Sequence, residues 1–571
     1  MNRFVLCLAA ALAGTAPLLP AVGQELAAGL AMSPVVIAPP ATPLAATIKA
    51  GLSSAYYGAA RDSAAYREGQ DLYFFYGARH FEPIWLDEGP DGQVAFSGNA
   101  QRIMRLFGDA ASLGLDPSDY LTPDLELASA GSDPASLAAL ETSFSAAVMR
   151  YATHLYTGRI DPRTVDEMLD IVPKRLDESA LLMELASSEQ PEAVLAALEP
   201  THPQYLALKA ALASFDETGA DRPAQLPEGP TLRVGMSDPR VPMLRTRLEL
   251  PASDSLLFDE VMVEAVRAFQ LAHALDVDGA VGPATRSALN GGVPVSRADI
   301  LANMERWRWM PRDLGEFHVF VNIPEFRLRI NRDGAETYTT RVVVGTVKNQ
   351  TPVFSDNIRH LVVNPYWNVP SSIVRGEVAP AVLRNPGYLD SQNMDLLYNG
   401  SPVSPWQVNW SMVSTSNFPF RVRQRPGPGN ALGQIKFLFP NKHDVYLHDT
   451  PSKSLFARDF RAFSHGCVRV ENPMEFADAL MANEPNISRA SLEAMFGSSE
   501  RWVNPTRQIP VHLAYFTVRV TDDGELVSIA DVYGHNAALI EAMGLGDLPD
   551  LPPEVVAAAA QVPASATTLS P

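Results

Sequence analysis

Two side chains in the C-terminal part of the sequence have types and positions suited to nucleophilic chemistry. His448 ends the strand-like run 444–448, and Cys467 follows Ser464, His465 and Gly466. A free thiol has a pKa near about 8.5, so only a few per cent is thiolate at neutral pH. A neighbouring imidazole can stabilise the thiolate and move its proton. The pair therefore indicates Cys467 as a nucleophile and His448 as its general base.

The glycine before the cysteine adds a second element of this chemistry. Gly466 lets the backbone approach a reacting carbonyl closely. We expect N–H groups around Gly466 and Cys467 to hold the oxyanion, since removing one such donor from other enzymes costs about 3–4 kcal/mol.

Three other interpretations of these residues remain to be weighed. His443, His448, His465 and Cys467 could bind zinc, but the sequence has no compact ligand pair of the kind that zinc modules use. A papain-like protease has its cysteine early and its histidine far downstream, which is the reverse order. A buried structural cysteine fits poorly with polar and glycine neighbours. Nucleophilic catalysis is the favoured interpretation.

Composition excludes several classes of protein. The chain has 571 residues and a formal net charge of −20, with 65 acidic residues against 45 Lys and Arg. A duplex-binding protein needs a positively charged surface, so nucleic acid is not an expected partner. Only two cysteines occur, Cys7 and Cys467. A disulfide scaffold and a paired-cysteine zinc module are therefore ruled out.

The N-terminus predicts export. An apolar run from Phe4 to about Pro20 follows a charged start and ends in small residues before Gln24. This is the anatomy of a cleaved secretory signal over residues 1–23, and no integral membrane span is expected after cleavage. Cys467 would then be the only thiol of the mature chain, in an oxidising compartment that favours disulfides. It is either an inert buried residue or a retained nucleophile.

Changes in composition and periodicity divide the rest of the chain. Apolar residues three and four apart predict helices before about 215, and a period of two after 313 predicts a mainly antiparallel sheet. Between 371 and 432 the alternation weakens and Pro and Gly recur, which predicts an inserted lid. The predicted segments are an Ala/Pro-rich linker 24–55, a helical domain 56–215, a linker 216–230, a small domain 231–292, a catalytic domain 293–540 with its insertion at about 371–432, and a disordered tail 541–571.

The small domain resembles the three-helix peptidoglycan-binding module of many wall enzymes. The resemblance rests on Phe269-Gln270 and on the Asp-Gly-x-x-Gly-Pro-x-Thr signature at 278–285. Such a module either binds the wall or acts only as a spacer, and the sequence leaves both roles open.

The cysteine segment resembles the signature of the YkuD-type L,D-transpeptidases. Ser464 to Arg469 reads Ser-His-Gly-Cys-Val-Arg, with His448 nineteen positions before the cysteine. Further agreement comes from the segments 303–309, 350–354 and 364–370. Together with the helical region, these segments resemble the large periplasmic YcbB-like subgroup.

The resemblance implies the overall fold. It indicates a multidomain α+β protein with a helical scaffold domain, a three-helix wall-binding module, and a mainly antiparallel YkuD-like β-sandwich that carries the lid insertion.

It also implies roles for individual residues. Cys467 is the nucleophile, His448 is the base, and the backbone carbonyl of Asp449 orients that base. His465 either shapes the loop and supports the oxyanion with Gly466, or acts as a second base. Arg469 either pairs with a substrate carboxylate or pins the loop through a salt bridge, and Asn472 either caps the next helix or contacts substrate. The candidate substrate-binding residues are Arg469, Ser464, Tyr446, Trp367 and Asn472.

The function that the resemblance implies is peptidoglycan cross-linking. A tetrapeptide stem would acylate the cysteine with release of D-alanine, and a second stem would then form a 3→3 cross-link. Water as acceptor would make the protein a carboxypeptidase, and loss of activity would leave a wall-binding scaffold. Expected partners are stem peptides, glycan and other wall-synthesis enzymes in the periplasm. No cofactor or metal is expected.

Overall fold

The computed structural model describes residues 37, 39–61, 63–89, 93–125, 133–215, 226–227, 229–272, 275, 277–289, 295–482 and 484–546. They form two compact units. The first holds the described parts of Met1–Ala111, Leu115–Tyr156 and Arg175–Glu199. The second holds those of Ser112–Gly114, Thr157–Lys174 and Pro200–Pro571. The predicted signal segment 1–23 lies outside the described residues, as does most of the predicted linker 216–230.

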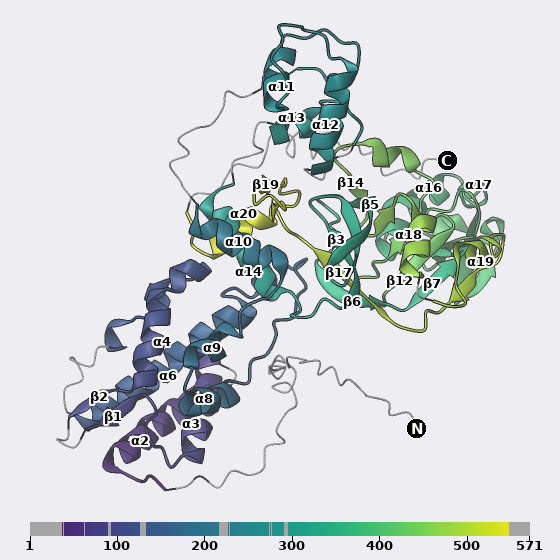
Figure 1. The fold of residues 1–571 in the computed structure, drawn as a ribbon. Helices are drawn as coiled ribbons and strands as arrows, with labels where there is room; N and C mark the ends of the chain where they lie inside the picture. Colours follow the sequence, from purple (N-terminus) through teal and green to yellow (C-terminus); the bar gives the residue numbers. More distant parts are fainter. Residues whose placement is uncertain are drawn as a thin grey trace, which may run out of the picture. The chain divides into compact units, whose positions relative to one another are not determined.

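The first unit is helical, with one short hairpin (Figure 1). Its core contains a buried carboxyl group, Glu141, which accepts hydrogen bonds from the Tyr76 hydroxyl at 2.7 Å and the Ile84 amide at 2.6 Å. Burial raises the pKa of Glu141 to about 7. The elements are α2 (Pro43–Gly58), α3 (Ala64–Ala78), β1 (Leu86–Glu88), β2 (Val94–Phe96), α4 (Gly98–Gly108), α6 (Pro134–Thr157), α8 (Glu178–Ser187) and α9 (Pro191–Ala196).

Helix α2 corrects the prediction that residues 24–55 form a linker, because its first three turns lie in that range. Thr42 caps the helix by accepting a hydrogen bond from the Ala45 amide, and Pro43 occupies the first turn, where proline is favoured. Ala45, Ile48 and Leu52 are buried at helical spacing. Pro43, which the composition places in a linker, therefore begins a helix.

The second unit contains a long mixed sheet. Its strand order is β16-β7-β12-β13-β15-β5-β4-β3-β17-β6, and β14 pairs with β5. The strands are β3 (Phe317–Asn322), β4 (Arg327–Arg332), β5 (Ala335–Gly345), β6 (Phe354–Ile358), β7 (His360–Val363), β12 (Ile435–Leu438), β13 (Leu447–His448), β14 (Ala462–Ser464), β15 (Val468–Val470), β16 (Arg501–Val503) and β17 (Ile509–Ala514).

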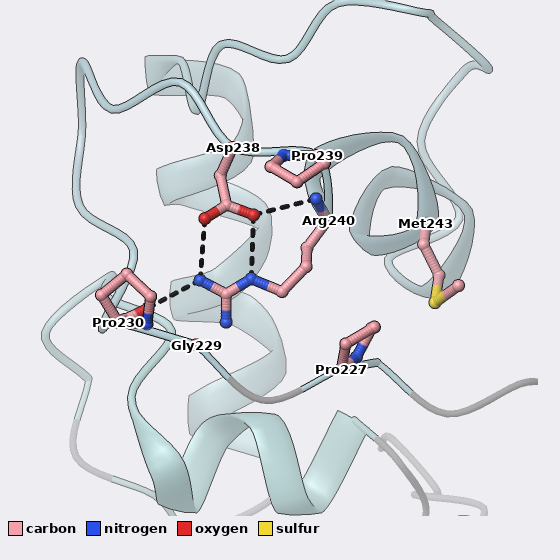
Figure 2. A pocket seen from close by; sticks show the side chains of 7 residues that line it. All are labelled: Pro227, Gly229, Pro230, Asp238, Pro239, Arg240 and Met243. Carbon is pink, nitrogen blue, oxygen red and sulfur yellow. Dashed lines mark hydrogen bonds and ion pairs between the residues drawn. The ribbon is translucent and has the colours of Figure 1, made fainter.

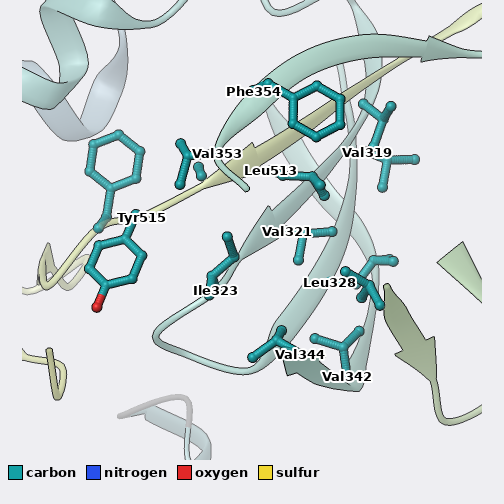
Figure 3. Packing of buried hydrophobic residues seen from close by; sticks show 14 of the residues in the cluster. Val319, Val321, Ile323, Leu328, Val342, Val344, Val353, Phe354, Leu513 and Tyr515 are labelled. Atoms are coloured by element: carbon teal, nitrogen blue, oxygen red, sulfur yellow. The ribbon is translucent and has the colours of Figure 1, made fainter. Parts of the chain in front are cut away.

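Alternating apolar residues build the core of this sheet, as their period predicts. On β3, Val319 and Val321 are fully buried, and they share a cluster with Leu328 on β4 and with Val342 and Val344 on β5 (Figure 3). The prediction of a multidomain fold with a mainly antiparallel catalytic sheet is confirmed. Pairs β13–β15, β3–β17 and β5–β14 are nevertheless parallel.

One buried helix, α14 (Arg297–Trp309), lies within the second unit and contacts α10 (Pro203–Ala213) and α20 (His535–Ala542). Ser296 and Asp299 form a capping box at its start. Glu305 accepts a hydrogen bond from the Ile160 amide at 2.9 Å and pairs with Arg308 at 3.1 Å, and both charged side chains are fully buried. This buried ion pair holds the chain that follows α6 against α14.

The insertion has a sheet and a core of its own, which we call the cap. Its strand order is β10-β9-β11-β8, and its apolar cluster contains Trp367, Val378 and Leu396. The cap elements are β8 (Trp367–Asn368), α15 (Ser371–Ile373), the π-helix η4 (Val374–Val378), α16 (Ala379–Arg384), α17 (Tyr388–Ser391), β9 (Met394–Tyr398), β10 (Ser401–Val403) and β11 (Arg421–Gln424).

The small domain contains the three expected helices, α11 (Val241–Arg247), α12 (Glu260–Ala272) and α13 (Pro283–Leu289). The Gln270 amide donates to the Asp278 carboxylate and the Thr285 hydroxyl, so the signature residues brace the turn between α12 and α13. A pocket of about 250 Å³ lies beside α11. Figure 2 shows the residues that line it, among which Asp238 and Arg240 form a bidentate ion pair.

The predicted tail begins too early. Helix α20 runs to Ala542, and Met543 is buried in the main core cluster, so residues 541–546 are part of the packed unit. The rest of the predicted tail, 547–571, lies outside the described residues. No helix in the described ranges is long and apolar enough to cross a bilayer.

Replacing Glu305 by alanine tests the buried pair. The change leaves the Arg308 guanidinium buried without its carboxylate, which costs about 3–5 kcal/mol when such pairs are broken. We expect a loss of that size in the free energy of unfolding, measured by urea denaturation. Glu493→Ala, which breaks an exposed pair with Arg489, is the control and should cost less than about 1 kcal/mol. Equal effects of the two changes would contradict this description of the core.

Candidate active site

The parallel pairing of β13 with β15 brings the predicted catalytic residues together. Leu447 is opposite Val468, and His448 is opposite Arg469. The Val468 amide donates to the Tyr446 carbonyl at 3.1 Å, which is a hydrogen bond of the Leu447–Val468 pair, and Cys467 directly precedes Val468. Side chains at even spacing along paired strands project to the same face. His448 and Cys467 are therefore diagonal neighbours on one face of the sheet.

His448 is held as a neutral base. The residue is only 4% exposed, and its ring Nδ1 is hydrogen bonded to the Asp449 carbonyl oxygen. A carbonyl can only accept, so the proton is on Nδ1 and Nε2 keeps its lone pair. Burial, followed by the charge of Arg469, lowers the pKa of His448 to about 3. The geometry agrees with the role that the resemblance implies for Asp449.

Cys467 is a protonated thiol at neutral pH. Burial raises its pKa to about 11, against the opposing effects of hydrogen bonds from Tyr446 and the charge of Arg469. Its Sγ contacts the Asp444 carbonyl oxygen at 3.7 Å. At neutral pH the thiol and the imidazole are thus both uncharged.

The turn before the cysteine is fixed by backbone interactions. Ser464 Oγ accepts from the Gly466 amide at 3.1 Å and donates to the Cys467 carbonyl at 2.5 Å. Gly466 has φ +112°, a value that favours glycine, and its carbonyl accepts from the Thr351 hydroxyl at 2.8 Å. The expected oxyanion donor at Gly466 is already engaged, which leaves the Cys467 amide for that role. Ser464 is buried and shapes the turn.

Positive charge lies on the same face. Lys436 on β12 is opposite His448, and its Nζ lies 5.8 Å from the centre of the Tyr446 ring. Arg469 Nε is buried without a hydrogen-bond partner, and no ion pair of Arg469 occurs in the described part of the chain. Of the two roles predicted for Arg469, the structure gives no support to a salt bridge that pins the loop.

The other predicted substrate residues have different surroundings. Tyr446 is beside the thiol and packs its ring against His448, with centroids 5.8 Å apart. Trp367 is only 6% exposed, in the cluster that forms the cap core, so the structure places it in packing. Asn472 is at the N-cap position of α18 (Pro473–Leu480), but its side chain makes no capping hydrogen bond. Of its two predicted roles, the structure therefore does not support the cap.

The imidazole of His465 is turned to the cap. Its Nε2 lies 3.0 Å from Glu377 Oε1 on η4. His443 is paired with Asp170 at 2.8 Å, and His448 faces a backbone carbonyl. The four residues of the zinc alternative therefore have separate partners, and no metal-binding group of three or more such side chains occurs among the described residues.

A carboxylate that the sequence does not predict holds the loop 441–445, which precedes the strand of His448. Asp170 accepts from Lys442 Nζ at 2.7 Å and lies 2.8 Å from His443 Nε2. Although burial acts to raise it, hydrogen bonds from Lys442 and His443 hold the pKa of Asp170 below its usual range. Asp170 is anchored in turn, because Leu169 bridges Val353 beside β6.

The loop held by Asp170 contacts the thiol through its backbone. Asp444 follows His443, has φ +55°, and presents its carbonyl to Cys467. Asn441 closes the loop through hydrogen bonds to the backbone of His443 and Val445. The sequence around Asp170 contains no motif that indicates this contact.

Comparisons with known proteins agree with this geometry. Residues 316–487 match the sequence model of the YkuD family, described as "L,D-transpeptidase catalytic domain". The chain carries a YkuD L,D-transpeptidase domain. Residues 70–212 match "Scaffold domain", and residues 244–289 match "Putative peptidoglycan binding domain".

A curated relative from Haemophilus influenzae, named "Putative L,D-transpeptidase", is 37% identical over 238 residues, which cover 41% of this chain. The match spans about half of that protein, 47% of its length. Among solved structures, an L,D-transpeptidase from Xylanimonas cellulosilytica is 17% identical, covering 50% of this chain and 98% of that one, with a TM-score of 0.17. One from Stackebrandtia nassauensis is 12% identical, covering 49% and 94%, with a TM-score of 0.21.

The pKa of the thiol predicts the pH dependence of its alkylation. Because burial raises the pKa of Cys467 to about 11, the rate with iodoacetamide should rise with pH up to that region. Arg469→Met removes a charge that lowers this pKa, so the profile should shift to higher pH. The measurement is loss of free thiol against pH. A rate that levels off below pH 8 would contradict a neutral resting pair.

Asp170→Asn tests the loop contact. The neutral amide weakens both ion pairs at nearly constant shape, and we expect acylation of Cys467 to slow by roughly ten- to a hundredfold, the scale of a small misplacement. Asp161→Asn, in an exposed pair of the same segment, is the control. The alkylation profile should change in the first variant only. A full rate in Asp170→Asn would show that the contact does not position the loop.

Proposed function

We propose that the protein is a peptidoglycan L,D-transpeptidase that forms 3→3 cross-links through a thioester on Cys467. The observation that carries the proposal is the placement of His448 and Cys467 on one face of a domain that matches the L,D-transpeptidases. The scaffold and wall-binding matches support the YcbB-like subgroup and a periplasmic location, with peptidoglycan stems and glycan as substrate.

In the first step, Cys467 Sγ attacks the carbonyl between the L-centred diamino acid and the terminal D-alanine of a tetrapeptide stem. Nε2 of His448 takes the thiol proton and gives it to the departing amine of D-alanine. The C–N bond breaks, a C–S bond forms, and free D-alanine leaves. In this proposal the Cys467 amide, directly before β15, stabilises the oxyanion.

In the second step, the side-chain amine of another stem attacks the thioester. The C–S bond breaks, an amide bond forms, and the amine proton returns through His448 to the sulfur. Arg469 and Lys436 add positive charge beside the reacting groups, which suits a substrate rich in carboxylates. Water as acceptor would give carboxypeptidase activity from the same thioester.

Intact-protein mass spectrometry tests the acyl-enzyme. Incubation with a disaccharide tetrapeptide should give an adduct that lacks one D-alanine, on Cys467 only. Cys467→Ala should give no adduct and no cross-linked product. His448→Asn, which removes the base, should slow adduct formation by about 10²–10⁴-fold.

A strained acyl donor distinguishes an active transpeptidase from a wall-binding scaffold without activity. A carbapenem should also acylate Cys467, because its ring opening needs the same thiol and base. If the full chain binds isolated sacculi but neither donor gives an adduct, the protein is a wall-binding scaffold and the proposal is wrong.

A further inference from the structure

One acidic side chain of the cap reaches the catalytic turn. Glu377 is on the π-helical stretch η4, a type of helix distortion that is frequent at functional sites. Its carboxylate lies 3.0 Å from His465 Nε2, and both side chains are partly exposed, at 23% and 30%. His465 is two positions before the nucleophile. Glu377 therefore lies at the edge of the site, within reach of solvent and of an incoming molecule.

The charges around the thiol are arranged unevenly. Lys436 and Arg469 are on strands of the sheet, close enough to lower the pKa of His448. Glu377 belongs to the cap, where burial and then its charge raise the pKa of Tyr388. Tyr446 packs on both the main core and the cap cluster, so the cap lies against a residue beside the thiol. Two cations of the sheet are thus close to His448, and the cap presents a carboxylate to the turn before the thiol.

The second step of the reaction needs a site for a cation. A primary amine on an alkyl chain has a pKa near about 10.4, so the acceptor arrives as an ammonium ion. The cations of the sheet would repel it, whereas a partly exposed carboxylate would bind it. His465 is a replaceable partner for Glu377, since an ammonium group offers the same carboxylate a charged donor.

We propose that Glu377 binds the ammonium group of the acyl acceptor. The inference rests on the proposed function and assigns the acceptor as a primary amine. One ammonium proton passes through the Glu377 carboxylate to solvent. The free amine then attacks the thioester, and its next proton passes through His448 to Cys467 Sγ as the C–S bond breaks. The carboxylate thus favours an amine over water as the acceptor.

The test measures how a preformed acyl-enzyme divides between the two acceptors. Acyl-enzyme made from tetrapeptide donor is mixed with a stem-peptide amine, and cross-linked product is compared with hydrolysed donor by mass spectrometry. Glu377→Gln keeps the shape and removes the charge, so we expect the ratio of aminolysis to hydrolysis to fall about tenfold or more. Asp390→Asn is the matched control, because this cap carboxylate contacts Trp406 and not the turn. Its ratio should equal that of the wild type.

A second variant separates binding of the amine from simple attachment of the cap. His465→Gln also breaks the pair with Glu377 but keeps the carboxylate, so its ratio should stay above that of Glu377→Gln. Equal losses in the two variants, or an unchanged ratio in Glu377→Gln, would overturn the proposal. Failure of the wild type to form any acyl-enzyme would instead overturn the proposed function.

Discussion

The candidate site depends on the parallel pairing of two very short strands. Strand β13 ends at His448 and β15 begins directly after Cys467, and their register places both side chains on one face. A shift of one residue would move one of them to the opposite face, because side chains alternate along a strand. The pairing is held from both sides, by β12 next to β13 and by β5 next to β15.

Burial of this face sets the protonation states. It lowers the pKa of His448 and raises that of Cys467, so neither group is charged at rest. The charge of Arg469 lowers the pKa of both groups, since it disfavours imidazolium and favours thiolate. The carbonyl of Asp449 selects the tautomer that exposes Nε2. The site therefore holds an uncharged thiol and an uncharged imidazole, and the proposed mechanism couples proton transfer to attack.

Much of the site follows from local sequence. The Ser-His-Gly-Cys-Val-Arg segment and the preceding histidine indicate the candidate reacting pair, and the structure shows that Gly466 has a positive φ in the turn before the thiol. Contacts between distant segments could not be predicted. Asp170 lies 273 positions before His443, and no pattern near either residue indicates their ion pair. The Ala- and Pro-rich composition of 24–55 hid helix α2, because its prolines favour a linker although alanine is a strong helix former. Trp367 matched a family segment, yet its burial shows packing.

In the proposed mechanism, a neutral His448 that is protonated on Nδ1 accepts the thiol proton at Nε2. Nitrogen-15 NMR of the histidine-labelled full chain measures this protonation state directly, with a His448→Asn variant to assign the signal. We expect the Nδ1–H tautomer throughout pH 5–8, because burial lowers the pKa of His448 to about 3. An imidazolium signal from His448 at pH 7, or a proton on Nε2, would contradict it.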